Sequence, residues 1–166
     1  MTSTITEQPA ATRRWTLDLA RSSADFHVGH FWGLITVNGH FDRFAGSYDG
    51  NTIELTIDAD SLDSGNKQRD THLRSGEFFD VDNHPQTTFR STTITNTGDG
   101  TLHVEGELEA AGKVLPLSFD ATIREDGDEL ELEATTPVDH RLFGMTWSPL
   151  GTVRAPARLH AKARLA

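Results

Sequence analysis

The chain has 166 residues, of which 36% are apolar and 24% charged, and its formal net charge is −10. This length fits one autonomously folding domain, and the negative charge argues against nucleic acid and against an anionic membrane surface as partners, because both attract cations. The absence of cysteine excludes disulfides and thiolate metal sites.

The N-terminal segment lacks the features of a secretion signal. It carries Glu7 and Pro9 where a signal peptide needs its apolar core, and no apolar run precedes Trp15. We therefore expect a disordered tail over residues 1–14, one domain over residues 15–166 and a cytoplasmic protein. Because no stretch approaches the apolar length of a membrane span, membrane insertion is not expected.

Apolar and polar residues alternate through most of the domain, which is typical of strands with one buried face. The pattern is clearest in the last segment, where Val153, Leu159 and Leu165 share one face and Arg154 and Arg158 the other. In chain order, the eight or nine predicted strands cover residues 15–19, 24–30, 35–44, 52–58, 87–94, 101–110, 114–123, 128–134 and 153–166.

The details of these strands favour a barrel or a sandwich. Glycine-containing turns such as NTGDG and EDGD separate the strands and fit antiparallel hairpins. The parity that buries Val37 and Phe41 would expose Phe44, which predicts a bulge near Asp42 or Arg43. Small residues at inner positions, among them Gly39, Gly106, Ala157 and Ala161, leave space that an eight-stranded barrel could use for one ligand. The pattern alone does not decide between this barrel and a filled sandwich core.

The segment between residues 58 and 87 lacks strand periodicity and is longer than a hairpin needs. Ser64 and Asn66 are possible caps of a short helix that breaks near Gly76. The apolar residues of this segment would face the sheet, which predicts a plug at one end of a barrel.

Several motifs in this chain resemble the YceI-like family of polyisoprenoid-binding proteins. They run in order from Trp15 to the C-terminus: WTLD, FHVGH, VNGHF, SLDSGNKQRDTHLRSGEFFDV, HPQTTFRS, VEGEL and DHRLFGM. Pattern and resemblance together predict an all-β, extended lipocalin-like antiparallel eight-stranded β-barrel with a short helical segment between two middle strands. The resemblance implies a cavity for a long isoprenoid chain, a possible homodimer and no catalytic activity, and we expect no cofactor.

Two departures from the family pattern affect what the resemblance implies. Many relatives carry a secretion signal, so the cellular ligand of this chain can differ from theirs. The hairpin from Leu108 to Leu115 reads LEAAGKVL, without the hydroxyl side chains common at this place, so polar contacts from this turn are not expected.

The predicted function is non-catalytic binding, sequestration or transport of a polyprenyl chain, a quinone or a similar amphiphile in the barrel cavity. For each candidate residue the alternative is an ordinary core position. The predicted ligand-binding residues are Phe26, Val28, His30, Val37, Phe41, Arg69, His72, Leu73, Phe78, Phe79, Phe89, Leu117, Phe119 and Trp147.

The polar residues of this set have two possible roles. His30 shares strand parity with Phe26 and would point inward, where it could bond a ligand head group or be satisfied by Asp70 or His72; we favour the structural role. Arg69 or Arg74 could grip a pyrophosphate, since guanidinium is a common anion clamp, or could hold the plug to the barrel.

Two other functions are weighed against lipid binding. A cavity enzyme that acts on an amphiphilic metabolite with His30 as its base remains an alternative. A metal site is not expected, because His27 and His30 are three residues apart on a strand and point to opposite faces. His103, His140 and His160 are predicted to face solvent.

Overall fold

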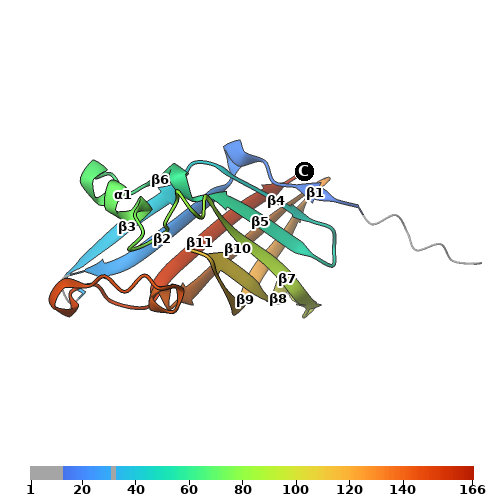
Figure 1. Cartoon of the computed structure of the whole chain (residues 1–166). Coiled ribbons are helices and arrows are strands. Elements are labelled where there is room, and N and C mark those ends of the chain that lie inside the picture. The colour runs from blue at the N-terminus through green and yellow to red at the C-terminus, as the bar shows by residue number, and fades with distance from the viewer. Residues whose placement is uncertain (1–12, 31–32) are drawn as a thin grey trace, which may run out of the picture.

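An antiparallel sheet that curls into a barrel-like wall dominates this computed structural model (Figure 1). Residues 13–30 and 33–166 are described, and within them eleven strands follow the order β1-β4-β5-β7-β8-β9-β10-β11-β2-β3-β6. The strands are β1 (Trp15–Thr16), β2 (Ser23–His30), β3 (Ile35–Phe41), β4 (Phe44–Tyr48), β5 (Ile53–Asp58), β6 (Leu62–Asp63), β7 (Gln86–Asn96), β8 (Thr101–Ala110), β9 (Lys113–Asp126), β10 (Glu129–Val138) and β11 (Ala157–Leu165). The helical elements are α1 (Lys67–Arg74) and the short 3₁₀ turns η1 (Leu19–Arg21), η2 (Ala59–Ser61), η3 (His140–Phe143) and η4 (Pro149–Gly151).

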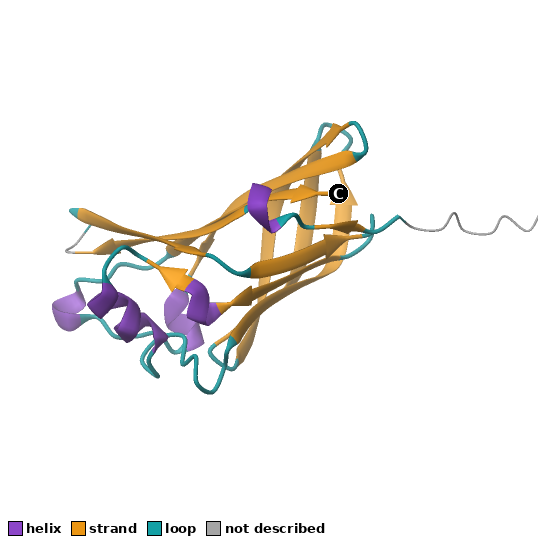
Figure 2. Cartoon of the chain, turned by 90° about the horizontal axis from the view of Figure 1, so that it is seen from above, coloured by secondary structure: helices purple, strands orange, loops and turns teal. Residues whose placement is uncertain are grey.

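The short strand β1 joins two margins of the sheet. On one side Trp15 lies opposite Tyr48 of β4. On the other side the Thr16 amide donates to the Ala166 carbonyl at 2.9 Å, and Leu17 bridges to Leu165 at the end of β11. β1 therefore closes a ring through β4 and β11, while β2, β3 and β6 extend from β11 as a three-stranded wing (Figure 2).

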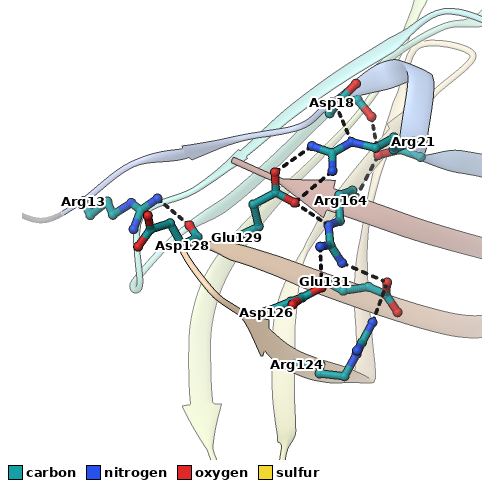
Figure 3. Close-up of polar contacts among 10 residues, drawn as sticks. Arg13, Asp18, Arg21, Arg124, Asp126, Asp128, Glu129, Glu131 and Arg164 are labelled. Carbon is teal, nitrogen blue, oxygen red and sulfur yellow. Dashed lines mark hydrogen bonds and ion pairs between the residues drawn. The ribbon is translucent and has the colours of Figure 1, made fainter.

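A network of charged side chains holds this closure (Figure 3). Arg21 donates to both carboxylate oxygens of Glu129 at 2.9 Å and to Asp18 at 2.7 Å. Arg164 donates to Glu129 at 2.7 Å and to Asp126 at 2.6 Å. The segment after β1 is thus tied to the β9–β10 hairpin and to the end of β11 by bidentate, charge-assisted bonds.

The prediction of one continuous strand over residues 35–44 is wrong. β3 ends at Phe41 and β4 begins at Phe44, so a break replaces the predicted bulge and lets both phenylalanines be buried. The Asp42 and Arg43 amides both donate to the Ser61 hydroxyl, which satisfies the backbone at the break. The break also separates β4, and β6 adds to the edge of β3, so the described residues form eleven strands instead of the predicted eight or nine.

The last predicted strand begins later than expected. It starts at Ala157, after a cis Ala155–Pro156 peptide, and residues 153–156 form no ladder. The Arg154 amide instead donates to the Gly29 carbonyl of β2 at 2.8 Å. From Ala157 onward the predicted alternation holds, and the basic outer face of β11 lies opposite the acidic outer face of β10, with Arg164 opposite Glu131.

The apolar interior consists of two clusters. The larger one includes Phe89, Leu102 and Val104 in the ring of strands, and the smaller one includes Phe26 and Phe41 in the wing. Leu17, Leu55, Phe79 and Leu159 pack against both clusters. The space between the clusters is therefore enclosed by apolar side chains on both sides.

The predicted short helix is confirmed as α1. Asn66 is its N-cap, and the Asn66 side-chain oxygen accepts from the Arg69 amide at 3.0 Å. The helix ends at Arg74, before Gly76, as the sequence indicates. In Figure 1, α1 lies beside β6, the strand at the edge of the wing.

Two expectations concern the ends and the membrane. Most of the predicted tail, residues 1–12, lies outside the described residues. In the part of the chain that is described, no helix is long and apolar enough to cross a membrane.

Candidate ligand cavity

A cavity of about 310 Å³ lies between the two apolar clusters. Side chains from both the ring and the wing line it, including Phe44 of β4, Leu55 of β5 and Leu132 of β10. This volume is at the lower end of the range for small-molecule sites, roughly 300–1,000 Å³. The predicted barrel with internal space is therefore correct, and a filled sandwich core is excluded.

The structure brings all of the predicted ligand-binding residues to this cavity. They come from β2, β3, α1, β7, β9 and the segments after α1 and η3. That each contacts a ligand stays a prediction. The lining includes Phe26, Val28, His30, Val37, Phe41, Arg69, His72, Leu73, Phe78, Phe79, Phe89, Leu117, Phe119 and Trp147.

The space expected at two small inner residues is filled by aromatic rings. A Cβ atom on Gly39 would lie 2.1 Å from Phe26 Cζ, and one on Gly106 would lie 2.7 Å from Phe89 Cζ. Each ring therefore rests directly on the backbone of a neighbouring strand. These glycines therefore do not enlarge the cavity. Because they lack side chains, the rings of Phe26 and Phe89 can pack directly on the neighbouring strands.

The plug predicted around α1 covers the wing side of the cavity. Leu73 and Phe79 pack against the smaller cluster, and the ring of Phe79 meets the ring of Phe41 edge-on at a centroid distance of 5.8 Å. Phe78 and Phe79 follow a turn in which the Phe79 amide donates to the Leu73 carbonyl at 3.0 Å. Local backbone bonds thus turn both phenylalanines inward immediately after the helix ends.

Two of the polar residues in question fasten this plug. Asp70, only 6% exposed, accepts from the Ser64 amide at 3.0 Å and also contacts the Ser64 hydroxyl. Arg69 donates to the Ser64 carbonyl at 2.7 Å and to its hydroxyl at 2.8 Å. Their hydrogen bonds therefore lie within the plug, which supports the structural alternative for both residues.

Arg74 has a similar anchoring role. Its guanidinium donates to the carbonyls of Leu62 at 2.8 Å and Asp60 at 3.1 Å. Leu62 is the first residue of β6, and Asp60 lies two residues before it. Arg74 therefore ties the end of α1 to the edge of the wing.

His72 and Trp147 bring the plug and the η3–η4 segment together. The His72 ring contacts the Glu77 carboxylate and lies edge-on to Trp147, with a centroid distance of 4.4 Å. Trp147 also meets Phe78 at 6.1 Å. Trp147 is 39% exposed although it lines the cavity, so the lining reaches the surface here.

His30 lines the cavity, as its strand parity predicts, whereas the His27 ring contacts Asn38 at 2.6 Å. Asp70 and His72, the partners expected for His30, are engaged with Ser64 and Glu77. His27 and His30 therefore lie in different environments, which agrees with the prediction that they point to opposite faces of the strand.

The prediction that His140 and His160 face solvent is wrong. His140 lines the cavity, its Nδ1 atom is buried without a hydrogen-bond partner among the described residues, and burial lowers its pKa. His160 bridges Glu133 at 2.9 Å and Asp25 at 3.4 Å, and the bond to Glu133 raises the pKa of His160. Alternation along a strand could not reveal either case, because His140 lies on a 3₁₀ turn and the partners of His160 lie on the neighbouring strands, Glu133 on β10 and Asp25 on β2.

The chemistry of the lining suits an apolar ligand. Most lining side chains are aliphatic or aromatic, and the arginine within the lining, Arg69, is already hydrogen-bonded to Ser64. Such a surface gains its binding energy from dispersed apolar contacts, with a few polar groups such as His30 and His140 to orient a ligand.

The chain is similar to bacterial proteins of the UPF0312 group. It is 33% identical over 109 residues to a member from Vibrio parahaemolyticus, and this match covers 61% of the chain and 57% of the relative. For a Vibrio vulnificus member the identity is 38% over the same coverage. The matched region thus spans less than two thirds of these relatives' length.

Two solved structures share the fold. BcnA from Burkholderia cenocepacia matches with a TM-score of 0.79 and 20% identity, covering 90% of this chain and 99% of BcnA. A polyisoprenoid-binding domain from Saccharophagus degradans, implicated in plant cell wall breakdown, matches with a TM-score of 0.76 and 14% identity, covering 91% of this chain and 97% of that domain. The profile of the YceI-like domain matches residues 15–165, so the chain belongs to the YceI-like family.

Proposed function

We propose that this protein binds one isoprenoid-type lipid, such as a polyprenyl chain, a quinone or a similar amphiphile, in the cavity and acts without catalysis. The observation that carries the proposal is the apolar cavity of about 310 Å³ between the two clusters. The polyisoprenoid-binding domain from Saccharophagus degradans, which has the same fold, supports this ligand class.

The energetics of the cavity fit such a ligand. Burial of a CH₂ group stabilises a complex by roughly 0.8 kcal/mol, so one five-carbon isoprene unit contributes about 3–4 kcal/mol before the cost of ordering the chain. A few units therefore suffice for tight binding. Because the volume is modest, a long chain would place some units inside and lead the remainder out past Trp147.

Native mass spectrometry of the freshly purified protein tests the proposal. A mass increment of one lipid per chain, identified after organic extraction, is the expected result. Protein that is empty and also takes up no added polyprenol or quinone would overturn the proposal and direct attention to catalysis at His30.

A paired variant makes this measurement specific for the cavity. Phe119→Asp places a charge on the cavity wall, whereas Val114→Asp alters an exposed position on the same strand β9. Lipid retention should be lost only in the first variant. Equal retention by both soluble proteins would place the lipid elsewhere.

A further inference from the structure

Large apolar side chains are exposed together at one end of the molecule. Leu34 and Ile35 follow β2 and are 85% and 52% exposed, and Leu150 in η4 is 90% exposed. Figure 1 shows the η3–η4 segment at the same end as the last residues of β2 and the first residues of β3. We call the exposed residues Leu34, Ile35, Trp147 and Leu150 together the apolar end.

Backbone contacts hold the two segments of the apolar end together. The Arg154 amide donates to the Gly29 carbonyl at 2.8 Å, and a Cβ atom on Gly33 would lie 3.6 Å from Arg154 Nε. Gly29 and Gly33 are therefore packed against Arg154, in the chain that leaves η4. The apolar end is a defined surface, not two independent loops.

Leu150 is unfavourable in two ways in the isolated protein. Its side chain is 90% exposed, and its backbone has a φ of +53°, in the left-handed region that disfavours a branched residue such as leucine. Strained backbone and exposed apolar surface are both common at functional sites. The combination at Leu150 indicates that its side chain serves an external contact.

The charge of the apolar end differs from that of the rest of the protein. Residues 26–41 and 140–166, which contain the apolar end, hold no acidic residue, although the net charge of the chain is −10. From the plug, the Glu77 carboxylate contacts His72, whose ring packs against Trp147. Arg154 is exposed and has no ion-pair partner among the described residues. The carboxylates of the closure network, including Asp126 and Glu129, lie at the opposite end of β2, whose eight residues span about 26 Å.

We propose that the apolar end docks on the surface of a phospholipid bilayer that contains anionic lipids. Leu34, Ile35 and Leu150 enter the interfacial region, Arg154 meets lipid phosphate, and the acidic end points to water. The net charge argues against such a surface for the whole molecule, but its uneven distribution favours this one orientation. No membrane-spanning element is involved.

The purpose of docking rests on the proposed function. Trp147 belongs to the apolar end and also lines the cavity. A lipid that leaves the cavity at Trp147 would therefore enter the bilayer without crossing water. The same arrangement serves uptake of a lipid from the bilayer.

Vesicle flotation tests the docking. Wild-type protein is mixed with vesicles of phosphatidylcholine and phosphatidylglycerol, and we expect it to float with them, and less so with phosphatidylcholine alone or at high salt. The double variant Leu34→Gln and Leu150→Asn should bind at least about tenfold more weakly, since leucine burial is lost while asparagine suits the left-handed backbone. Arg154→Gln should weaken binding about fivefold.

The matched control is Leu19→Gln in η1, a 42% exposed leucine at the other end of β2 that should leave flotation unchanged. The docking is overturned if the wild-type protein does not float. It is also overturned if the double variant floats like the wild type, or if Leu19→Gln weakens flotation. Loss of a dimer in the double variant overturns it as well, because the apolar end would then bind a second copy.

Lipid content separates this inference from the proposed function. Protein that retains lipid in native mass spectrometry but does not float overturns docking alone. Protein that floats but neither carries nor takes up a lipid overturns the proposed function, and docking then remains as a membrane contact without lipid exchange.

Discussion

The ring of Phe26 lies on the backbone of Gly39, its direct partner in the neighbouring strand β3. A Cβ atom at Gly39 would approach Phe26 Cζ to 2.1 Å, far closer than atoms can pack. Glycine is required here because a side chain would collide with the ring. Backbone conformation is not the reason, since the φ of Gly39 is not in the left-handed region. The pair fixes one wall of the cavity.

Gly39→Ala should lower the free energy of unfolding by about 1–3 kcal/mol, as expected for overpacking. Urea denaturation measures the change. Gly76→Ala is the matched control, because the nearest atom to its added Cβ is 3.9 Å away. Phe26→Leu in the Gly39→Ala background should recover part of the loss, and strictly additive effects of the two changes would argue against direct contact.

Phe79→Asp should abolish lipid retention and leave a soluble protein. The phenyl ring packs between the two apolar clusters and against Phe41, so a carboxylate there would be buried or would push the plug outward. Native mass spectrometry measures retention, with Phe79→Leu as the conservative control that keeps the ligand. Wild-type retention by Phe79→Asp would remove Phe79 from the cavity.

Asp70→Asn should loosen the plug and lower the free energy of unfolding by about 1–3 kcal/mol, since a buried acceptor of two Ser64 bonds is altered. Hydrogen exchange over residues 64–79 should increase locally. The control is Asp82→Asn, at an exposed position later in the same segment. If both variants exchange like the wild type, Asp70 does not fasten the segment.

Glu129 should make the barrel closure sensitive to acid. Hydrogen bonds from Arg21 and Arg164 lower its pKa from 4.5 to about 2. A lowered carboxyl pKa contributes stability above pH 4.5, and that contribution is lost as the pH falls toward 2. Glu129→Gln should reduce stability at neutral pH and flatten this part of the pH profile of unfolding.

Glu107→Gln, an exposed carboxylate on β8, is the control for Glu129. Identical acid profiles for the Glu129 variant and the wild type would contradict a role for the network in closing the barrel.

His140→Leu should raise stability, and more so in acid. Burial lowers the pKa of His140, so the unfolded chain binds its proton more readily, and stability falls as the pH drops through the ordinary histidine range near 6.5 toward the folded value. Removing a buried nitrogen that has no hydrogen-bond partner among the described residues should add about 1 kcal/mol at neutral pH. Thermal unfolding at several pH values measures both effects, and an unchanged pH slope would contradict them.

The sequence predicts most of the fold because alternation and family motifs act over whole strands. β7 to β10 and the helix capped by Asn66 follow directly from their patterns. The break between Phe41 and Phe44 does not, because it depends on bonds from the distant Ser61 hydroxyl. The two-residue strands β1 and β6 are too short to carry a periodic signal.

The candidate cavity is predictable in its members but not in its shape. Strand parity and the apolar residues of the plug identify the lining. The aromatic rings that lie over Gly39 and Gly106 can be located only when the register between neighbouring strands is known. Alternation along single strands does not reveal that register. The burial of His140 likewise depends on how the η3 turn folds back onto the wall.

Closure of the ring through Thr16 and Ala166 sets the order in which this protein can fold. The bonds between these residues join positions 150 residues apart, so their formation carries the largest loop-closure cost of the ring. During synthesis the ring cannot be sealed until Ala166 has left the ribosome, because β1 can pair with β4 early but with the end of β11 only then. Slow, late folding with exposed strand edges follows from this topology, and it makes the nascent chain a candidate for chaperone protection.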